Sequence, residues 1–379
     1  MIINRIQLNN FRNYETLDVD FTRGVNLLYG DNAQGKTNIL EAVYVSATTK
    51  SLRNSKDREM IRLGRDEAHI STYLTKDNCP HKIDMHLKKN KVKGIAIDGI
   101  PIKKSSELMG LLHVISFSPD DLSMMKEGPQ ERRRFLDMEL CQMDRVYCSN
   151  LAGYNHSLVQ RSSLLKQLAE SGSKELAETL EVWNRQLVAY GTEVIRRRRS
   201  FVSDIMPIVK EKHSLLSDGR EELCMGYLPN CSEESFEEKL FLEQDRDIYL
   251  RCTSVGPHRD DLDFTIDGNS VRLYGSQGQQ RTVALALKLA EIEIVKNRLK
   301  EEPVLLLDDV LSELDRNRQL QLLSEIKSIQ TIVTCTGMEE FVSCRTGEDS
   351  VYLVRDCSVR KMPGENPELH EVRNIWRLV

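Results

Sequence analysis

The sequence predicts an α/β fold interrupted by a long helical segment, and three observations support this. A β-compatible run at 25–29 leads into a glycine-bearing loop at 30–37 and then into a helical pattern at 38–43. A second apolar run, at 304–307, ends in two aspartates, as a buried parallel strand can. Between these parts, apolar residues recur at helical spacing. We therefore expect an α/β body with a helical arm inserted into it.

The glycine-bearing loop reads GDNAQGKT and fits G-x-x-x-x-G-K-[ST] without a mismatch. Its glycines free the backbone so that successive N–H groups converge on phosphate oxygens, and the next helix points its positive end at the same anion. Lys36 should reach the β- and γ-phosphates of a nucleotide, and Thr37 should bind Mg²⁺. The expected nucleotide-binding residues are Gly30, Asp31, Asn32, Ala33, Gln34, Gly35, Lys36 and Thr37.

The two aspartates after the apolar run at 304–307 are Asp308 and Asp309. Carboxylates at the C-terminal end of a buried strand are where a Mg²⁺–nucleotide site draws its second anchor. The phosphate loop and these carboxylates therefore predict a site for ATP and Mg²⁺.

Composition limits the remaining possibilities. The chain has 379 residues, enough for more than one domain, and its 53 basic and 58 acidic residues give a net charge of -5. Any nucleic-acid surface must therefore be local. Nine scattered cysteines without a C-x-x-C pair fit neither a zinc site nor a disulfide framework. With no signal-like N-terminus and no apolar run near about 18 residues, we expect a cytoplasmic protein without a membrane span.

Two basic features lie in the first part of the chain. Strands are expected at 2–8 and 14–21, and the turn between them carries Arg12. Arg12 could equally well contact a phosphate or be a solvated surface charge. The run at 86–104 predicts a basic β-hairpin. Its lysines could equally well contact a DNA backbone or form a solvated face. Its lysines are Lys88, Lys89, Lys91, Lys93, Lys103 and Lys104.

The middle of the chain is predicted to be helical. One helix opens at 130–137 and its apolar spacing continues to Leu168, SGS at 171–173 ends it, and a second helix follows through Ile195. The short connection predicts an antiparallel helical hairpin. We interpret the four arginines at 196–199 as a charge cluster at the C-terminus of the second helix rather than as a binding patch. Residues 214–248 are acidic and predict irregular surface connections.

The chain returns to α/β character after residue 250. GPHRDD at 256–261 precedes a strand at 262–266, and YGSQGQQR at 274–281 leads into a helix at 282–296. A polar, glycine-bearing loop at a helix N-terminus is a second place where an anion can bind.

This ordered series of motifs resembles the ABC-type ATPase heads of the SMC-like DNA repair proteins, and most closely the RecF family. The resemblance spans nearly the whole chain and implies an ABC-type P-loop ATPase head with an inserted helical arm domain. It implies a head lobe at 1–118, the arm at 119–250 and a second head lobe at 251–379. The motifs are NFRNY at 10–14, the phosphate loop, PD at 119–120, GP at 128–129, RRRFLD at 132–137, GPHRDD at 256–261, SQGQQR at 276–281 and LLLDDVLSELD at 305–315.

The resemblance also assigns roles to residues. It implies that Asp308 supports Mg²⁺, that Asp309 positions or activates the attacking water, and that residues 276–279, from Ser276 to Gln279, face the γ-phosphate held by a partner subunit. Lys36, Asp309 and Ser276 would then be catalytic, and Arg12 would join the nucleotide-binding set. The loop at 312–315 would signal between subunits.

Three departures from the general ABC pattern predict slow turnover. Asp309 stands where glutamate is usual, Gln277 replaces the first glycine of S-G-G-Q, and no histidine stands at 331–336 as a switch residue. Slow hydrolysis suits a switch better than a motor. Thr336 is our candidate for the switch position, and the end of a buried strand is an equally good interpretation of it.

The resemblance implies an ATP-dependent DNA-binding protein of repair and replication. Such a protein binds single-stranded, gapped or linear double-stranded DNA, is a weak DNA-stimulated ATPase, forms an ATP-dependent homodimer and works with RecR and RecO to load recombinase at gaps. One alternative is a head that partners a nuclease, but the arm is too short for a long coiled coil and no nuclease metal cluster is evident. The other is a transport ATPase subunit, against which the arm and GPHRDD argue.

Overall fold

The computed structural model describes residues 1–119, 121, 124–326, 328–336 and 349–362, so Asp120 of the PD motif lies outside the described residues. The chain forms two compact units, one from 1–122 with 291–379 and the other from 123–290. Residues 251–290 thus pack with the helical arm, whereas the family resemblance placed them in a head lobe. The predicted functional lobes at 1–118, 119–250 and 251–379 stay a prediction.

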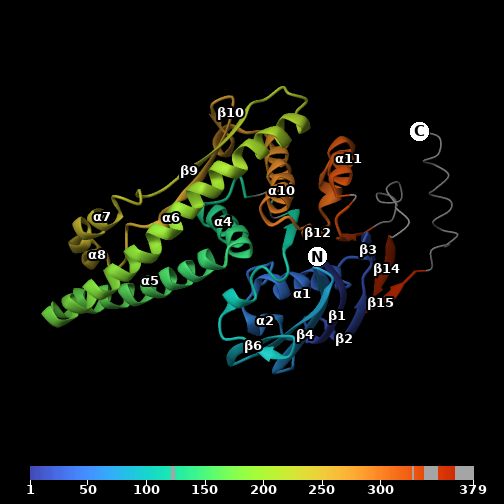
Figure 1. The fold of residues 1–379 in the computed structure, drawn as a ribbon, viewed down its shortest axis with the longest axis horizontal. Coiled ribbons are helices and arrows are strands. Elements are labelled where there is room, and N and C mark those ends of the chain that lie inside the picture. Colours follow the sequence, from blue (N-terminus) through green and yellow to red (C-terminus); the bar gives the residue numbers. More distant parts are fainter. Residues whose placement is uncertain (120, 122–123, 327, 337–348, 363–379) are drawn as a thin grey trace. The chain divides into compact units, whose positions relative to one another are not determined.

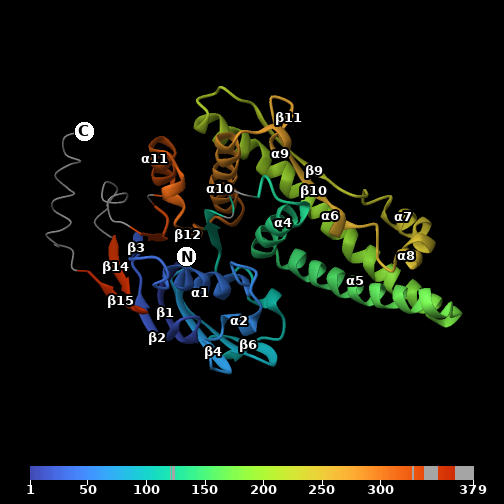
Figure 2. The ribbon, with the colours of Figure 1, turned by 180° about the vertical axis from the view of Figure 1, so that it is seen from behind.

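The first unit contains a mainly parallel sheet in the order β15-β14-β3-β13-β12-β8, in which only β15 runs antiparallel to its neighbour. Strands β14 and β15 extend the sheet beyond β3 (Figure 2). The predicted strands at 25–29 and 304–307 are confirmed as β3 and β12. The strands are β3 (Val25–Tyr29), β8 (Val114–Phe117), β12 (Val304–Asp308), β13 (Thr331–Cys335), β14 (Ser350–Arg355) and β15 (Ser358–Lys361).

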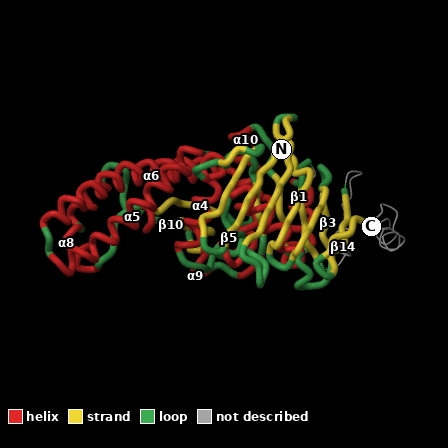
Figure 3. Tube along the Cα trace, turned by 90° about the horizontal axis from the view of Figure 1, so that it is seen from below, coloured by secondary structure: helices red, strands yellow, loops and turns green. Residues whose placement is uncertain are grey.

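A second, antiparallel sheet in this unit has the order β2-β1-β4-β5-β6-β7. Its long strands lie side by side in Figure 3, and β1, β4 and β5 alternate between buried and more exposed side chains, as expected when one face covers a core. The basic hairpin predicted at 86–104 is confirmed in β5, β6 and β7. The strands are β1 (Ile2–Phe11), β2 (Tyr14–Asp20), β4 (Glu67–Lys76), β5 (Cys79–Lys88), β6 (Lys91–Ile97) and β7 (Ile100–Pro101).

Helix α1 (Lys36–Thr48) lies in the core of the first unit, because eleven of its 13 residues are buried. It contacts β4 and β5 of the antiparallel sheet and β8, β12 and β13 of the parallel sheet. A helix that is buried on all sides has no solvated polar face, so its buried polar side chains bond to other protein groups: Glu41 pairs with Arg12, and Ser46 forms a hydrogen bond with Thr72. Among the described residues, this unit also contains α2 (Asp57–Met60) and α11 (Arg316–Glu325), with 3-10 turns at Ser105–Glu107 and Val310–Glu313.

The second unit is built around the long helices α5 (Arg145–Ser171) and α6 (Lys174–Leu216), which lie side by side (Figure 1). Leu165 and Leu168 of α5 pack against Leu180 of α6, which confirms the predicted antiparallel hairpin. The single helix predicted from 130 to 168 is wrong, because α4 (Pro129–Met143) ends before Asp144. The Asp144 side chain accepts hydrogen bonds from the backbone N–H groups of the next two helical residues after Arg145 and so starts a new helix.

The arginine run at 196–199 does not end a helix, because α6 continues to Leu216. Arg198 is buried and donates to Asp137 and Asp260, whereas its exposed neighbour Arg199 pairs with Glu233. Acidic partners neutralise the run, so it can occupy the middle of a helix instead of a C-terminus.

Residues 214–248 are more ordered than predicted. They contain β9 (Leu223–Leu228), α7 (Phe236–Leu242) and most of α8 (Gln244–Leu250). Buried Phe236 and Leu240, four residues apart, leave Glu237 and Glu238 on the exposed face of α7, whereas Asp247 of α8 is buried and pairs with Arg161.

A small antiparallel sheet completes the second unit in the order β11-β10-β9. The strand and turn predicted at 262–269 are confirmed, and the predicted helix at 282–296 begins five residues earlier, at Gln277. No helix of the described residues could cross a membrane. The remaining elements are β10 (Asp261–Ile266), β11 (Asn269–Ser270), α9 (Val271–Tyr274), α10 (Gln277–Leu299) and a 3-10 turn at Pro257–Arg259.

Candidate nucleotide site

The predicted phosphate loop connects the end of β3 to the start of α1. Gly30 and Gly35 have φ angles of +152° and +107°, in the region that favours glycine. A Cβ atom on Gly30 would lie 2.2 Å from the carbonyl oxygen of Val354, and one on Gly35 would lie 2.6 Å from the hydroxyl of Tyr14. Both glycines are therefore required for the shape of the loop, and residues 31–33 between them are exposed.

Lys36 extends back over this loop although it is the first residue of α1. Its Nζ donates to the carbonyl oxygens of Gly30, at 2.5 Å, and Asp31, at 2.9 Å. An ammonium group has three donors, so one remains for a phosphate oxygen. No side chain caps α1, which leaves the positive end of a 13-residue helix directed toward the same loop.

Asp308 lies beside the loop at the C-terminal end of β12. Its Oδ1 accepts hydrogen bonds from Thr37 Oγ1 and Thr334 Oγ1, each at 2.8 Å. Parallel pairing of β12 with β13 sets Asp308 opposite Thr334, which brings distant residues together at one edge of the sheet. The hydroxyl of Thr37 and the carboxylate of Asp308 are the hard oxygen donors that Mg²⁺ prefers, so this pair fits the expected ion.

Asp309 follows directly, with a left-handed φ of 56°. Its backbone N–H donates to Thr334 Oγ1 at 3.0 Å, so one threonine fixes both aspartates. Burial raises the pKa of Asp309 above its ordinary value, against the opposing charge of Lys36, and the neighbouring Asp308 adds to the rise. A carboxylate with a raised pKa is a better proton acceptor, as a general base requires.

The predicted signature loop belongs to the second unit. Ser276 N–H donates to Gln279 Oε1 at 2.8 Å, and Gln279 N–H donates to Ser276 Oγ at 3.2 Å, which is a reciprocal capping box at the start of α10. Gln279 Nε2 also donates to Glu221 at 3.0 Å. Ser276 is exposed, and its hydroxyl proton is not used by the cap. The loop is therefore ordered and can still donate to an anion.

Comparison with known proteins then identifies the family. The family model described as RecF/RecN/SMC N terminal domain matches residues 2–356. The DNA replication and repair protein RecF of Lachnoclostridium phytofermentans is 57% identical over 361 residues, covering 95% of this chain and 100% of that protein. The chain belongs to the RecF family. The RecF of Agathobacter rectalis is 56% identical over 354 residues, covering 93% of this chain and 97% of that protein.

Solved structures confirm the predicted fold class. Two structures of the recombination mediator protein RecF in the RecFOR pathway, described as RecF-ATPrS and RecF-ATP, give TM-scores of 0.87 and 0.88 at 34% identity. They cover 95% and 96% of this chain, and it covers 98% of each. The Smc head domain derived from Pyrococcus furiosus gives a TM-score of 0.56 at 16% identity over 99% of both chains, which supports the fold alone. The fold is therefore that of an ABC-type ATPase head with a helical arm.

Two residues of the NFRNY motif at 10–14 contact the phosphate loop and the start of α1. Asn13 Oδ1 accepts from Asn38 Nδ2 of α1 at 2.7 Å, and Tyr14 lies against Gly35. Arg12 has partners within the protein. Its guanidinium forms a bidentate salt bridge with the Glu41 carboxylate, with two N–O distances of 2.7 Å, and it also donates to Ser55 Oγ at 2.8 Å. A nucleotide contact by Arg12 stays a prediction.

The six lysines of the basic hairpin do not share one environment. Lys93 is mostly buried, and its Nζ donates to Asp57 Oδ1 at 2.9 Å and to the Thr49 carbonyl, so it links the hairpin to other residues of the first unit. Lys89 has a distant pair with Asp66 at 3.7 Å. Lys88 is half-buried, and the exposed lysines besides Lys89 are Lys91, Lys103 and Lys104.

Sequence reasoning missed Thr334, because its role depends on the register of two parallel strands. Thr336 is exposed beyond the end of β13, and its assignment as the switch residue stays a prediction. An apolar strand with a threonine near its end, next in the sheet to the strand with the two aspartates, is the signal that could have found Thr334.

Proposed function

We propose that this chain is an ATP-dependent DNA-binding protein of DNA repair and replication, in which ATP binding and slow hydrolysis act as a switch. The observation that carries the proposal is the hydrogen-bonded group of Thr37, Asp308 and Thr334 beside the phosphate loop. In this proposal the group supplies the oxygen ligands for the Mg²⁺ ion that accompanies ATP. The names of the RecF relatives supply the biological setting, since they are DNA replication and repair proteins.

In this proposal the groups of the nucleotide site have separate tasks. The loop N–H groups and Lys36 bind and orient the phosphates, while Thr37 and Asp308 provide oxygen ligands for Mg²⁺. Bound Mg²⁺ neutralises charge on the transferred phosphoryl group. Asp309 holds the attacking water and accepts its proton. Its side chain is one methylene shorter than glutamate, so hydrolysis is expected to be slow.

The phosphate loop is tested by Lys36→Arg, with the exposed Lys50→Arg as the matched control. The guanidinium keeps the charge but replaces a compact ammonium with a broad fork. We expect Lys36→Arg to lose hydrolysis and retain part of ATP binding, whereas Lys50→Arg keeps both. Binding is measured with a fluorescent ATP analogue and hydrolysis by phosphate release. Normal hydrolysis by Lys36→Arg would remove the loop from the mechanism.

The switch is proposed to be an ATP-dependent homodimer. In an ABC-type head, the signature loop of one subunit completes the nucleotide site of another, and a two-fold axis then gives two composite sites. The exposed Ser276, with its free hydroxyl proton at the start of α10, supports this role. ATP favours the closed dimer through the γ-phosphate contact, and hydrolysis removes that contact.

The dimer is tested by Ser276→Arg, with the exposed Ser200→Arg of α6 as the control for added charge and bulk. Analytical ultracentrifugation with a non-hydrolysable ATP analogue should give dimers for wild type and Ser200→Arg. Ser276→Arg should bind ATP near normally and stay monomeric. A wild-type protein that stays monomeric with ATP analogue and DNA, or a Ser276→Arg variant that dimerises, would refute the signature-loop assignment.

DNA contact is proposed for the exposed lysines of the basic hairpin. Neutralising Lys89, Lys91 and Lys104 should reduce the slope of log affinity against log salt by about 0.9 per lost duplex phosphate contact. Lys210→Ala on α6, whose lysine pairs with Glu222, is the control. An unchanged slope in the triple variant would show that these lysines do not contact DNA phosphates and that the DNA-binding surface lies elsewhere.

The substrate is proposed to be single-stranded, gapped or linear double-stranded DNA, where the protein helps RecR and RecO to load recombinase. The RecF structures that this chain resembles belong to the RecFOR pathway, which supports these partners. Gel shifts with gapped and intact duplexes, with and without ATP, should show ATP-dependent binding that favours the gap. Binding that ignores both ATP and the gap would contradict the proposal. A cytoplasmic location goes with this role.

A further inference from the structure

A cluster of three metal-ligating side chains lies on the outer face of the antiparallel sheet. Glu67 and His69 are two residues apart on β4, so their side chains share one face of the sheet. His86 on β5 is directly opposite His69 in the strand register. The ligand atoms of the three side chains all lie within 4.8 Å of one another. The register of β4 and β5 therefore creates this cluster from residues that are separate in sequence.

The three side chains are already in contact. His86 Nε2 lies 2.5 Å from Glu67 Oε2, and the rings of His69 and His86 stack with centroids 3.9 Å apart at 25°. Gly94 is opposite His86 on β6 and has no side chain to cover it. The side chains of His86 and Glu67 are 31% and 54% exposed, so an ion can reach them from solvent.

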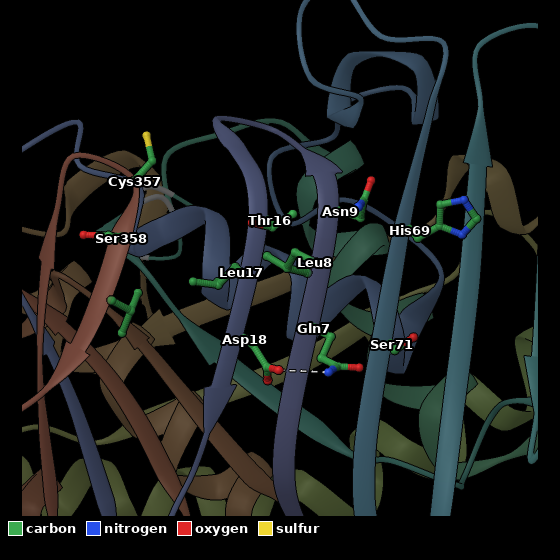
Figure 4. Close-up of a pocket in the computed structure, with 11 residues that line it drawn as sticks. Gln7, Leu8, Asn9, Thr16, Leu17, Asp18, His69, Ser71, Cys357 and Ser358 are labelled. Carbon is green, nitrogen blue, oxygen red and sulfur yellow. Dashed lines mark hydrogen bonds between the residues drawn. The ribbon is translucent and has the colours of Figure 1, made fainter.

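His69 also lines a surface hollow of about 540 Å³. Figure 4 shows it on β4 at one side of that hollow, near Asn9 of β1, with Cys357 and Ser358 on the opposite side. The cluster therefore borders open space, and the thiol of Cys357 belongs to the far wall.

We propose that Glu67, His69 and His86 form a binding site for a divalent transition metal ion, with Zn²⁺ as the ion that fits best. Two imidazole nitrogens and one carboxylate oxygen are ligands that Zn²⁺ accepts in tetrahedral geometry. Three protein ligands leave the fourth position for water. None of these residues is used by the phosphate loop, Asp308 or the signature loop.

Binding requires only side-chain movement. Bonds of about 2.0–2.2 Å in a tetrahedron separate the donor atoms by roughly 3.3–3.6 Å. Glu67 and His86 must move slightly apart and the two stacked rings must splay, which their exposure permits. Lys88 is opposite Glu67 in the register, and its positive charge opposes a bound cation. Lys88→Ala should therefore tighten the site.

The test is isothermal titration of Zn²⁺ into the full-length protein, with excess Mg²⁺ present to occupy oxygen ligands at the nucleotide site. We expect His69→Asn and His86→Asn each to lose one zinc equivalent and Glu67→Gln to bind it at least about tenfold more weakly. His81→Asn is the matched control, because His81 also lies on β5 and pairs with a carboxylate, Asp98, outside the cluster.

The exposed thiols of Cys79, Cys224 and Cys357 can also bind Zn²⁺, but they are the same in all these variants. The difference in zinc binding between variants therefore reports the cluster. Equal zinc stoichiometry and affinity in wild type and the His69→Asn/His86→Asn double variant would overturn the proposal. Loss of zinc in His81→Asn as large as in His86→Asn would overturn it too. Melting temperatures without zinc establish that each variant is folded.

Discussion

Replacing Arg198 should destabilise the second unit far more than replacing its neighbour Arg199. The Arg198 side chain is 2% exposed and donates to Asp260 at 2.9 Å, Asp137 at 2.7 Å and the Pro257 carbonyl at 2.7 Å. Arg198→Met keeps an apolar stem of similar length but leaves the fully buried Asp260 carboxylate without its cation. Breaking such a pair costs about 3–5 kcal/mol, which shifts the melting temperature of a unit of this size on the order of 10 °C.

Arg199→Met is the control, because Arg199 is 49% exposed and its pair with Glu233 is worth less than about 1 kcal/mol. Urea unfolding is followed by the fluorescence of Trp183 on α6, in a Trp376→Phe background so that one tryptophan reports. An Arg198→Met loss within about 1 kcal/mol of the Arg199→Met loss would show that the buried network does not hold this unit together.

Three further changes test other parts of the structure. Thr334→Val removes the hydroxyl that holds Asp308, and it should lower phosphate release more than ATP affinity; equal losses of both would contradict this. Gly30→Ala places a Cβ against the Val354 carbonyl, so fluorescent-ATP titration should show lost binding. Burial lowers the pKa of His258 to about 4. Between pH 6.5 and pH 4 the unfolded chain therefore takes up a proton that the folded protein does not, and the free energy of unfolding should fall by about 3 kcal/mol over this range. His258→Phe should flatten that profile in urea unfolding.

The phosphate loop and the strand before Asp308 could be predicted because each is a local pattern. Glycine positions, an apolar run and a following helical pattern define the loop within twenty residues, and buried parallel strands are apolar throughout. The helical hairpin of α5 and α6 followed from helical spacing and the short SGS connection, although the break between α4 and α5 did not. These features depend on the neighbouring sequence, so one sequence is enough to find them.

Thr334, Arg198 and Lys93 could not be assigned, because their roles depend on distant partners. Four consecutive arginines look alike in sequence, and the phase of α6 together with Asp137 and Asp260 selects the one that is buried. Lys93 looks like its neighbours in the basic run until β6 brings it to Asp57. Each choice requires a strand register or a helix phase that the local pattern leaves open.

The strand order around β3 has a consequence for how the protein is made. β3 pairs with β13 on one side and β14 on the other, and both are encoded near the far end of the chain. On the ribosome, residues 123–290 are complete and can fold before either partner strand emerges. Until then both edges of the apolar β3 lack their partner strands, and a strand with unpaired edges can pair with another chain and aggregate. A nascent chain that stops before residue 331 carries the whole phosphate-loop sequence without the sheet that gives it shape.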